Sequence, residues 1–216
     1  MTDHHHEEPF WRKYIFSVDH KVIGIQYAVT AMVFLLFGFF LMLIMRWNLA
    51  YPGEVVPIVG QLFGSEGSKM LSSEGMLTPD GYNAFGAMHG TIMVFLGVVP
   101  LAVGGFGNYV LPLQVGAPDM AFPKINMASY WSFFLGGVCM LASFFMPQGT
   151  ASSGWTMYAP LSVIATTGET MWLIGRTDMD APSVFRLDAV CHCVPTAPRI
   201  SSVGSSRCFS AHGPPL

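Results

Sequence analysis

Long apolar runs alternate with shorter polar segments along the sequence. Three runs, at about 22–45, 84–111 and 125–145, are long enough to cross a bilayer, which takes about 20 helical residues. A fourth starts near Leu161 and stops at Gly175, too short for a full span. Because lipid offers the backbone no hydrogen-bond partners, and no barrel-type alternation is visible, the runs are predicted to be helices. The predicted fold class is all-α: a polytopic transmembrane helical bundle with three full spans and an incomplete fourth.

Composition agrees with this pattern. Hydrophobic residues make up 52% of the chain and charged residues only 11%, whereas a soluble chain carries about 25% charge. The opening segment is polar and the first apolar run is too long for a signal-peptide core, so the first helix is expected to direct insertion. Membrane lipid is therefore the expected surrounding, and nucleic acid is not an expected partner.

Basic residues predict the orientation in the membrane. They lie before the first span and in the turn between the second and third spans, which places both segments on the cytoplasmic side: Arg12, Lys13, Lys21 and Lys124. Residues 1–21 are thus predicted to form a cytoplasmic N-terminal segment. The first loop carries more acidic than basic residues and is expected outside. Within the second span, Pro100 and the glycines that follow it predict a kink.

The character of the sequence changes at Gly175. Residues 176–216 hold four of the ten basic residues and five of the fifteen prolines, and they have no apolar face. Three interpretations remain open: a shifted reading frame or mis-joined gene, a genuine cytoplasmic tail, and a small zinc-binding extension. The spacing of its candidate ligands is too tight for the usual zinc site: Cys191, His192, Cys193 and Cys208. The irregular mixture favours the first interpretation and predicts a disordered tail.

His89 lies inside the second apolar run. An ionisable side chain in a membrane helix costs several kcal/mol unless it is paired or coordinated, so it is a functional candidate. Neutral imidazole is a common axial ligand of haem iron. Gly86 and Gly90 would let a flat macrocycle or another helix approach closely. Haem ligation and a hydrogen bond to a neighbouring helix are equally compatible with this pattern.

Other candidate residues each have two interpretations. Asp119 in the predicted cytoplasmic turn is either a solvated carboxylate or a proton-uptake group, and it lies at the opposite membrane face from His89. Arg46 at the end of the first span either reaches the lipid headgroups or donates to a cofactor. Trp155 and Tyr158 either anchor the chain at the membrane interface or face a cofactor.

Four motifs together resemble a known family. SVDHKVIG, AMHGTIMVF, GGFGNYVLPLQVGAPDMAFPKIN and SGWTMYAPL occur in matching order between Phe10 and Gly175. They resemble subunit I of the haem-copper terminal oxidases, of the cytochrome c oxidase type. The resemblance implies that electrons pass from cytochrome c through a low-spin haem to a high-spin haem and copper centre, which reduces oxygen to water while protons are pumped. Residues 22–175 would then be part of the membrane domain.

The resemblance also implies roles near the low-spin haem, expected to be of the haem a type. His89 matches one of its two axial ligands, and Arg46 matches an arginine that hydrogen-bonds a haem substituent. Tyr82 matches a position near that haem, and Trp155 falls near the haem edge and its propionates.

For proton uptake, the resemblance makes Asp119 the mouth of a channel and Asn126 an asparagine that lines it. Met127 departs from the family pattern, because many members have a second asparagine there, so the polar lining of the channel would differ.

Much of the family's machinery has no counterpart in this sequence. The second low-spin haem ligand, the high-spin haem ligand, the copper-binding histidines and an inner glutamate belong to later helices of the family. High-spin haem and copper are therefore expected only in a full-length protein, and this chain alone is predicted to be inactive. The implied setting is a bacterial-type cell membrane, with oxidase subunits II and III and cytochrome c as partners. A quinol-oxidising relative, or a non-catalytic haem-binding or assembly component, remains the alternative.

Overall fold

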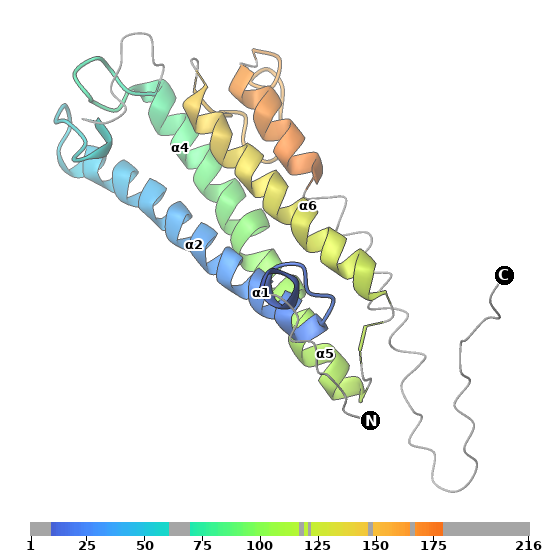
Figure 1. The fold of residues 1–216 in the computed structure, drawn as a ribbon. Helices are drawn as coiled ribbons and strands as arrows, with labels where there is room; N and C mark the ends of the chain where they lie inside the picture. Colours follow the sequence, from blue (N-terminus) through green and yellow to red (C-terminus); the bar gives the residue numbers. More distant parts are fainter. Residues whose placement is uncertain are drawn as a thin grey trace, which may run out of the picture.

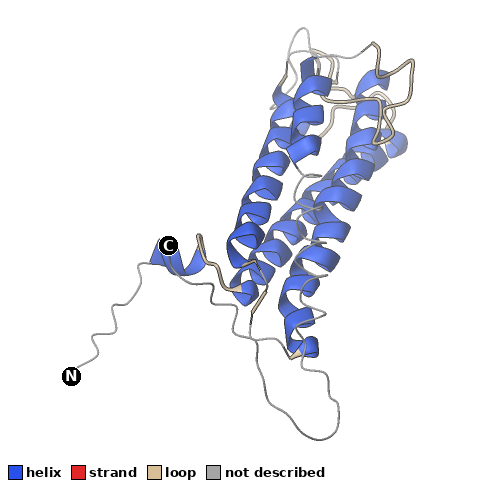
Figure 2. Cartoon of the chain, turned by 90° about the vertical axis from the view of Figure 1, so that its right-hand side faces the viewer, coloured by secondary structure: helices blue, strands red, loops and turns tan. Residues whose placement is uncertain are grey.

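The computed structural model describes residues 10–60, 70–116, 119–120, 122–146, 149–164 and 167–178. Within these residues the chain is helix and loop without a named strand, in agreement with the predicted all-α class (Figure 2). Three helices are long and apolar enough to cross a membrane, which confirms the three predicted spans. They lie side by side in Figure 1. Their bounds are His20–Ala50, Pro79–Gln114 and Pro123–Phe145.

Each span begins earlier or ends later than the apolar run that predicts it. The first span is α2 (His20–Ala50), and the third is α6 (Pro123–Ala142) with the short η3 (Ser143–Phe145). The second joins four segments: α4 (Pro79–Thr91), η1 (Ile92–Val98), η2 (Pro100–Phe106) and α5 (Gly107–Val115). A short helix, α1 (Phe10–Tyr14), precedes them.

The fourth predicted span, 161–175, is displaced along the sequence. Residues 161–164 form turns, and the described helix occupies residues 167–178, so it continues across Gly175. This helix lies beside α6 in Figure 1. The rest of the predicted tail, including the candidate zinc ligands, lies outside the described residues, as do the first nine residues.

Capping residues account for the helix ends that hydropathy misses. The Asp19 side chain accepts from the Lys21 backbone N–H at 2.9 Å and so starts α2 before the apolar run. Thr78 does the same for the Gly81 N–H at 3.0 Å, with Pro79 in the first turn of α4. At the other end of this span, Gly116 adopts φ 74°, a left-handed conformation that terminates α5.

A kink is predicted at Pro100, and the structure has two π-helical segments there, η1 and η2. Proline has no N–H to donate, so the ladder is interrupted there and the turns on both sides widen. The Val99 N–H bonds the Val94 carbonyl and the Gly107 N–H bonds the Ala102 carbonyl, five residues back in each case.

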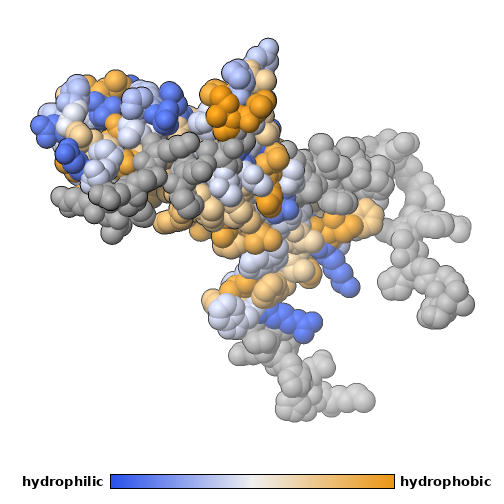
Figure 3. Space-filling view, turned by 90° about the horizontal axis from the view of Figure 1, so that it is seen from above, coloured by the Kyte–Doolittle hydropathy of each residue, from blue (hydrophilic) through white to orange (hydrophobic). Residues whose placement is uncertain are grey.

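Glycines bring the helix backbones together. A Cβ atom at Gly24 would lie 3.1 Å from the Gly105 carbonyl oxygen, and one at Gly38 would lie 2.7 Å from the Met93 sulfur. Such close approach through small residues is typical of membrane helix pairs. On the other side of α2, a stripe of apolar side chains faces outward from the described helices: Ile25, Val29, Met32, Val33, Leu36, Phe39, Phe40 and Leu43. Figure 3 shows hydrophobic side chains over the middle of the molecule and hydrophilic ones mainly towards its ends.

Candidate functional site

His89 is fixed by the contact between α4 and α2. Its Nδ1 lies 2.8 Å from the carbonyl oxygen of Gly38, and the imidazole is half-buried. A carbonyl oxygen can only accept, so Nδ1 carries the proton and Nε2 keeps its lone pair in the neutral ring. A hydrogen bond from the ring nitrogen that does not bind the metal orients a ligating histidine and makes it a better ligand. The geometry therefore leaves Nε2 available to bind a metal ion.

The surroundings of His89 have room on one side. A Cβ atom at Gly90 would meet nothing within 4 Å, and one at Gly86 would meet only the Met45 sulfur, at 3.7 Å. A planar group could approach the helix there without displacing side chains. The site fits a haem as far as one axial ligand is concerned. Among the described residues, no three His, Cys, Asp or Glu side chains cluster closely enough to hold a metal ion by themselves.

Arg46 and Tyr82 lie on the same two helices as this contact but are not joined to His89. Arg46 is exposed near the end of α2, and within the described residues its guanidinium makes no hydrogen bond or ion pair. It lies eight residues beyond Gly38, about 12 Å along the helix axis. Tyr82 is half-buried against the core, two turns before His89 on α4.

Trp155 is brought to the second span from the loop that follows α6. Its exposed ring lies 5.9 Å from the ring of Phe95, which is six residues beyond His89. Arg176 holds it there, because its Nη1 donates to the Trp155 carbonyl at 2.5 Å while its guanidinium lies 4.6 Å from the Phe95 ring centre. Trp155 thus packs on the second span at Phe95, six residues beyond His89. Tyr158, its companion in the same motif, is exposed.

Asp119 is paired with a residue that sequence reasoning missed. The Nδ1 of His20 lies 3.0 Å from the Asp119 Oδ1 atom, and the Met120 backbone N–H donates to the same oxygen at 2.7 Å. The side chain of Asp119 remains 45% exposed, whereas that of His20 is 5% exposed. The carboxylate therefore faces water on one side and a buried imidazole on the other. The second carboxylate near this imidazole is Asp19, at 3.6 Å.

Asn126 is the other predicted proton-pathway residue, and it is 3% exposed. Neither its amide nitrogen nor its amide oxygen has a hydrogen-bond partner among the described residues. A second buried amide, Asn108 on α5, donates to the Gly104 carbonyl at 2.7 Å, but its own oxygen has no partner in the described part of the chain. Unpaired buried amides are places where ordered water binds. Asn126 and Asn108 are thus two buried amides with unpaired atoms among the described residues.

Weak signals for the two missed residues are present in the sequence. Asn108 is an amide inside an apolar run, which is costly in lipid unless it has a use. His20 stands directly before the first apolar run, where a solvated histidine would be unremarkable. Its pairing with Asp119 joins residues 99 positions apart, and only the fold shows it.

Comparison with known proteins gives the same family as the motifs. The sequence model of the family described as cytochrome c and quinol oxidase polypeptide I matches residues 22–185, most of the chain. This chain belongs to that family. The match ends ten residues beyond the predicted boundary at Gly175, so that boundary stays a prediction.

Curated relatives of the family align with the same region. Cytochrome c oxidase subunit 1 of Thermostichus vulcanus is 46% identical over 166 residues, covering 76% of this chain and 26% of the relative. The alternative cytochrome c oxidase subunit 1 of Bradyrhizobium diazoefficiens is 37% identical over 168 residues, covering 78% and 25%. Cytochrome c oxidase subunit 1 of Synechocystis is 38% identical over 186 residues, covering 86% and 30%. The chain therefore spans about a quarter of the length of these relatives.

Proposed function

We propose that this chain is the N-terminal part of a respiratory oxidase subunit I that supplies one axial ligand to a low-spin haem and the mouth of a proton-uptake route. The hydrogen bond between His89 Nδ1 and the Gly38 carbonyl carries the proposal, because it leaves Nε2 of a neutral imidazole free for iron. Family membership adds the reaction class, since its members are membrane oxidoreductases.

The residues of this chain would bind the haem and orient it. His89 would ligate the iron with its ring fixed by Gly38, and Arg46 would donate to a haem substituent. Tyr82 would lie near the haem, and Trp155 near its edge and propionates. The bound haem a would supply one-electron transfer.

At the other end of α2, Asp119 would collect protons from water. Its exposed oxygen takes up the proton, and the buried imidazole of His20 holds the carboxylate in place, which makes His20 a positioning residue. Asn126 would hold water molecules that carry the proton inward, since both its amide atoms need partners.

In the complete protein this function would be electron transfer from cytochrome c to oxygen, coupled to proton pumping. The high-spin haem and copper, subunits II and III and the docking of cytochrome c would belong to that longer assembly, and this chain alone would not reduce oxygen. Cytochrome c is preferred over quinol as donor because the aligned relatives carry cytochrome c oxidase names. The site would lie in a bacterial-type cell membrane with the N-terminus in the cytoplasm, because basic residues flank that side.

Haem titration with an added second ligand tests the proposed haem site. The chain would be purified in detergent with His4–His6 replaced by Asn, then mixed with one equivalent of haem and at most one equivalent of imidazole, so that free imidazole cannot supply both nitrogen ligands of the iron. A six-coordinate low-spin absorption spectrum is expected. It should be lost in His89→Ala and kept in the matched control His20→Ala. An unchanged spectrum in His89→Ala would remove the assigned ligand.

Proton uptake is tested separately in an intact relative. Asp119→Asn at the matching position should slow turnover and proton uptake while the haem content stays the same. Unchanged turnover would remove the role of Asp119 without touching the haem assignment.

A further inference from the structure

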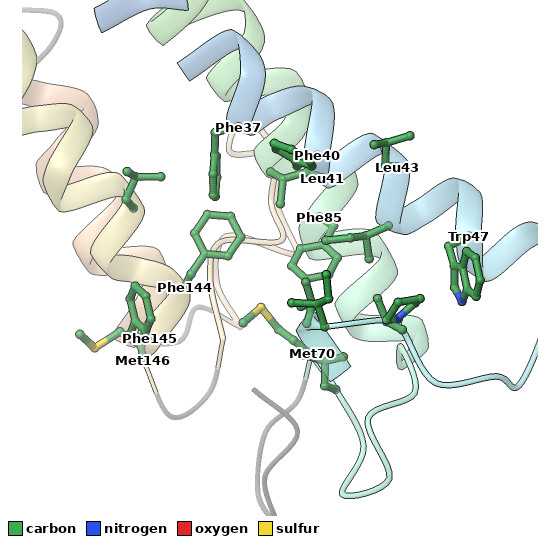
Figure 4. A pocket seen from close by; sticks show the side chains of 17 residues that line it. Phe37, Phe40, Leu41, Leu43, Trp47, Met70, Phe85, Phe144, Phe145 and Met146 are labelled. Carbon is green, nitrogen blue, oxygen red and sulfur yellow. The ribbon is translucent and has the colours of Figure 1, made fainter. Parts of the chain in front are cut away.

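A large apolar pocket lies at the end of the bundle where α2 meets the loop after it, away from Asp119. Its volume is about 780 Å³, within the range of about 300–1,000 Å³ usual for small-molecule pockets. Figure 4 shows Phe37, Phe85 and Phe144 around it. The Phe37 and Phe144 rings pack edge to face at 5.6 Å, and those of Phe85 and Phe144 lie 6.1 Å apart. One wall is thus formed in advance by packed aromatic rings.

The pocket offers almost nothing to a polar ligand. Among the described residues that line it, none carries a charge, and the indole of Trp47 is the one side chain with a hydrogen-bond donor. A charged or strongly polar molecule would lose its hydration without gaining partners. The chemistry of the walls therefore selects a hydrocarbon chain.

The walls also differ from the surfaces that this protein uses to pack helices. Where helices meet, glycines allow contact, as at Gly38 against Met93 and Gly137 against Phe34. No Gly, Ala, Ser or Thr occurs among the described lining residues, which are large apolar side chains, one proline and Trp47. Membrane helices associate through small residues. A further helix would therefore fit this hollow poorly, and a thin flexible chain would fit it well.

The pocket opens onto the exposed apolar stripe of α2. Phe40 and Leu43 belong to the exposed apolar stripe of α2 and also line the pocket, as does the exposed Phe145 beyond α6. A lipid molecule could thus enter sideways from the bilayer without crossing a polar rim. We propose that the pocket holds one acyl chain of a membrane phospholipid as a bound lipid, independently of the proposed oxidase function.

Native mass spectrometry of the purified 216-residue chain tests this proposal. Delipidated protein would be titrated with dioleoyl phosphatidylcholine, and one tightly retained lipid per chain is expected. Leu43→Trp, which fills the pocket, should weaken retention at least tenfold. Leu36→Trp is the matched control, because Leu36 is on the same helix and 56% exposed, against 45% for Leu43, but does not line the pocket. It should change retention less than twofold.

Two probes on the unmodified chain keep the test decisive if Leu43→Trp fails to fold. Dihexanoyl phosphatidylcholine has the same headgroup but chains too short to fill the pocket, so it should bind at least tenfold more weakly. Dioleoyl phosphatidylglycerol should bind within twofold, since no described wall residue reads the headgroup. Brominated acyl chains should also quench part of the tryptophan fluorescence. This quenching should be absent in Trp47→Phe, because Trp47 is the tryptophan that lines the pocket. Three results would overturn the proposal. They are equal binding of short-chain and long-chain lipids, a dependence of binding on the headgroup, and an equal loss of retention in Leu43→Trp and Leu36→Trp.

Discussion

Gly137 sets how closely α6 approaches α2, and alanine at this position should destabilise the bundle. A Cβ atom there would lie 2.5 Å from Cζ and 3.0 Å from Cε2 of Phe34, and 3.2 Å from Cδ2 of Leu96. Phe34 is buried, and its ring also packs edge to face on Phe133 at 6.2 Å, so it has little room to move. Overpacking of this kind costs about 1–3 kcal/mol, and the better helix propensity of alanine returns up to about 1 kcal/mol. A net loss of about 1–2 kcal/mol is expected from these two effects.

Unfolding of the detergent-solubilised chain by sodium dodecyl sulfate, followed by circular dichroism, measures this loss. Gly90→Ala is the matched control, because its Cβ atom meets nothing within 4 Å, and it should be neutral or slightly stabilising. Phe34→Leu shortens the ring that clashes, so a double-mutant cycle with Gly137→Ala should give a favourable coupling of about 1 kcal/mol. Wild-type stability in Gly137→Ala, or a coupling of zero, would refute the close-contact argument.

Three further substitutions test other contacts by the same unfolding assay. Tyr27→Phe removes the 3.1 Å bond to the Ser129 hydroxyl and should cost about 0.5–1 kcal/mol, because that hydroxyl keeps its backbone acceptor. Gly175→Ala puts a Cβ atom 2.6 Å from the Gly136 carbonyl oxygen and should cost about 1–3 kcal/mol and raise hydrogen exchange in the last helix. The buried Ser153 hydroxyl donates to the Glu169 carboxylate. Glu169→Ala removes this acceptor and should cost about 1–3 kcal/mol, whereas Glu169→Gln keeps an acceptor oxygen and should cost less.

The apolar runs predicted the spans because about 20 apolar residues in a helix match the thickness of the bilayer core. The ends of the helices are set by capping residues instead. Asp19 and Thr78 start their helices by capping, so both helices begin in polar sequence that hydropathy assigns to loops. Pro100 predicted a distortion, since a missing N–H is visible in the sequence. Its π-helical form depends on how the next carbonyls find new donors, which only the fold decides.

The residues of the candidate site stand out in the sequence, whereas their contacts do not, and their roles stay predictions. His89 is conspicuous because imidazole is rare in an apolar run, yet its acceptor is a backbone carbonyl of Gly38, which no side-chain pattern reveals. His20 and Asn108 were missed for the related reason that burial and pairing arise from helix packing. The apolar pocket has no motif either, since its described walls come from five separate stretches of the chain.

Helix α2 contacts both proposed sites, the proton-uptake site at Asp119 and the haem site at His89, and holds them apart. It meets Asp119 through His20 at one end and His89 through Gly38 eighteen residues later, about 27 Å along the axis. A direct interaction between the two sites is therefore excluded, and any coupling must pass through other groups. Between α2 and α6 the described structure has two hydrogen-bonded hydroxyl pairs, Tyr27 with Ser129 and Thr30 with Tyr130. Because substitutions more than about 10 Å apart usually add, changes in stability from His89→Ala and Asp119→Asn should add in the double variant. Non-additivity would mean that the helix itself transmits strain between the two ends.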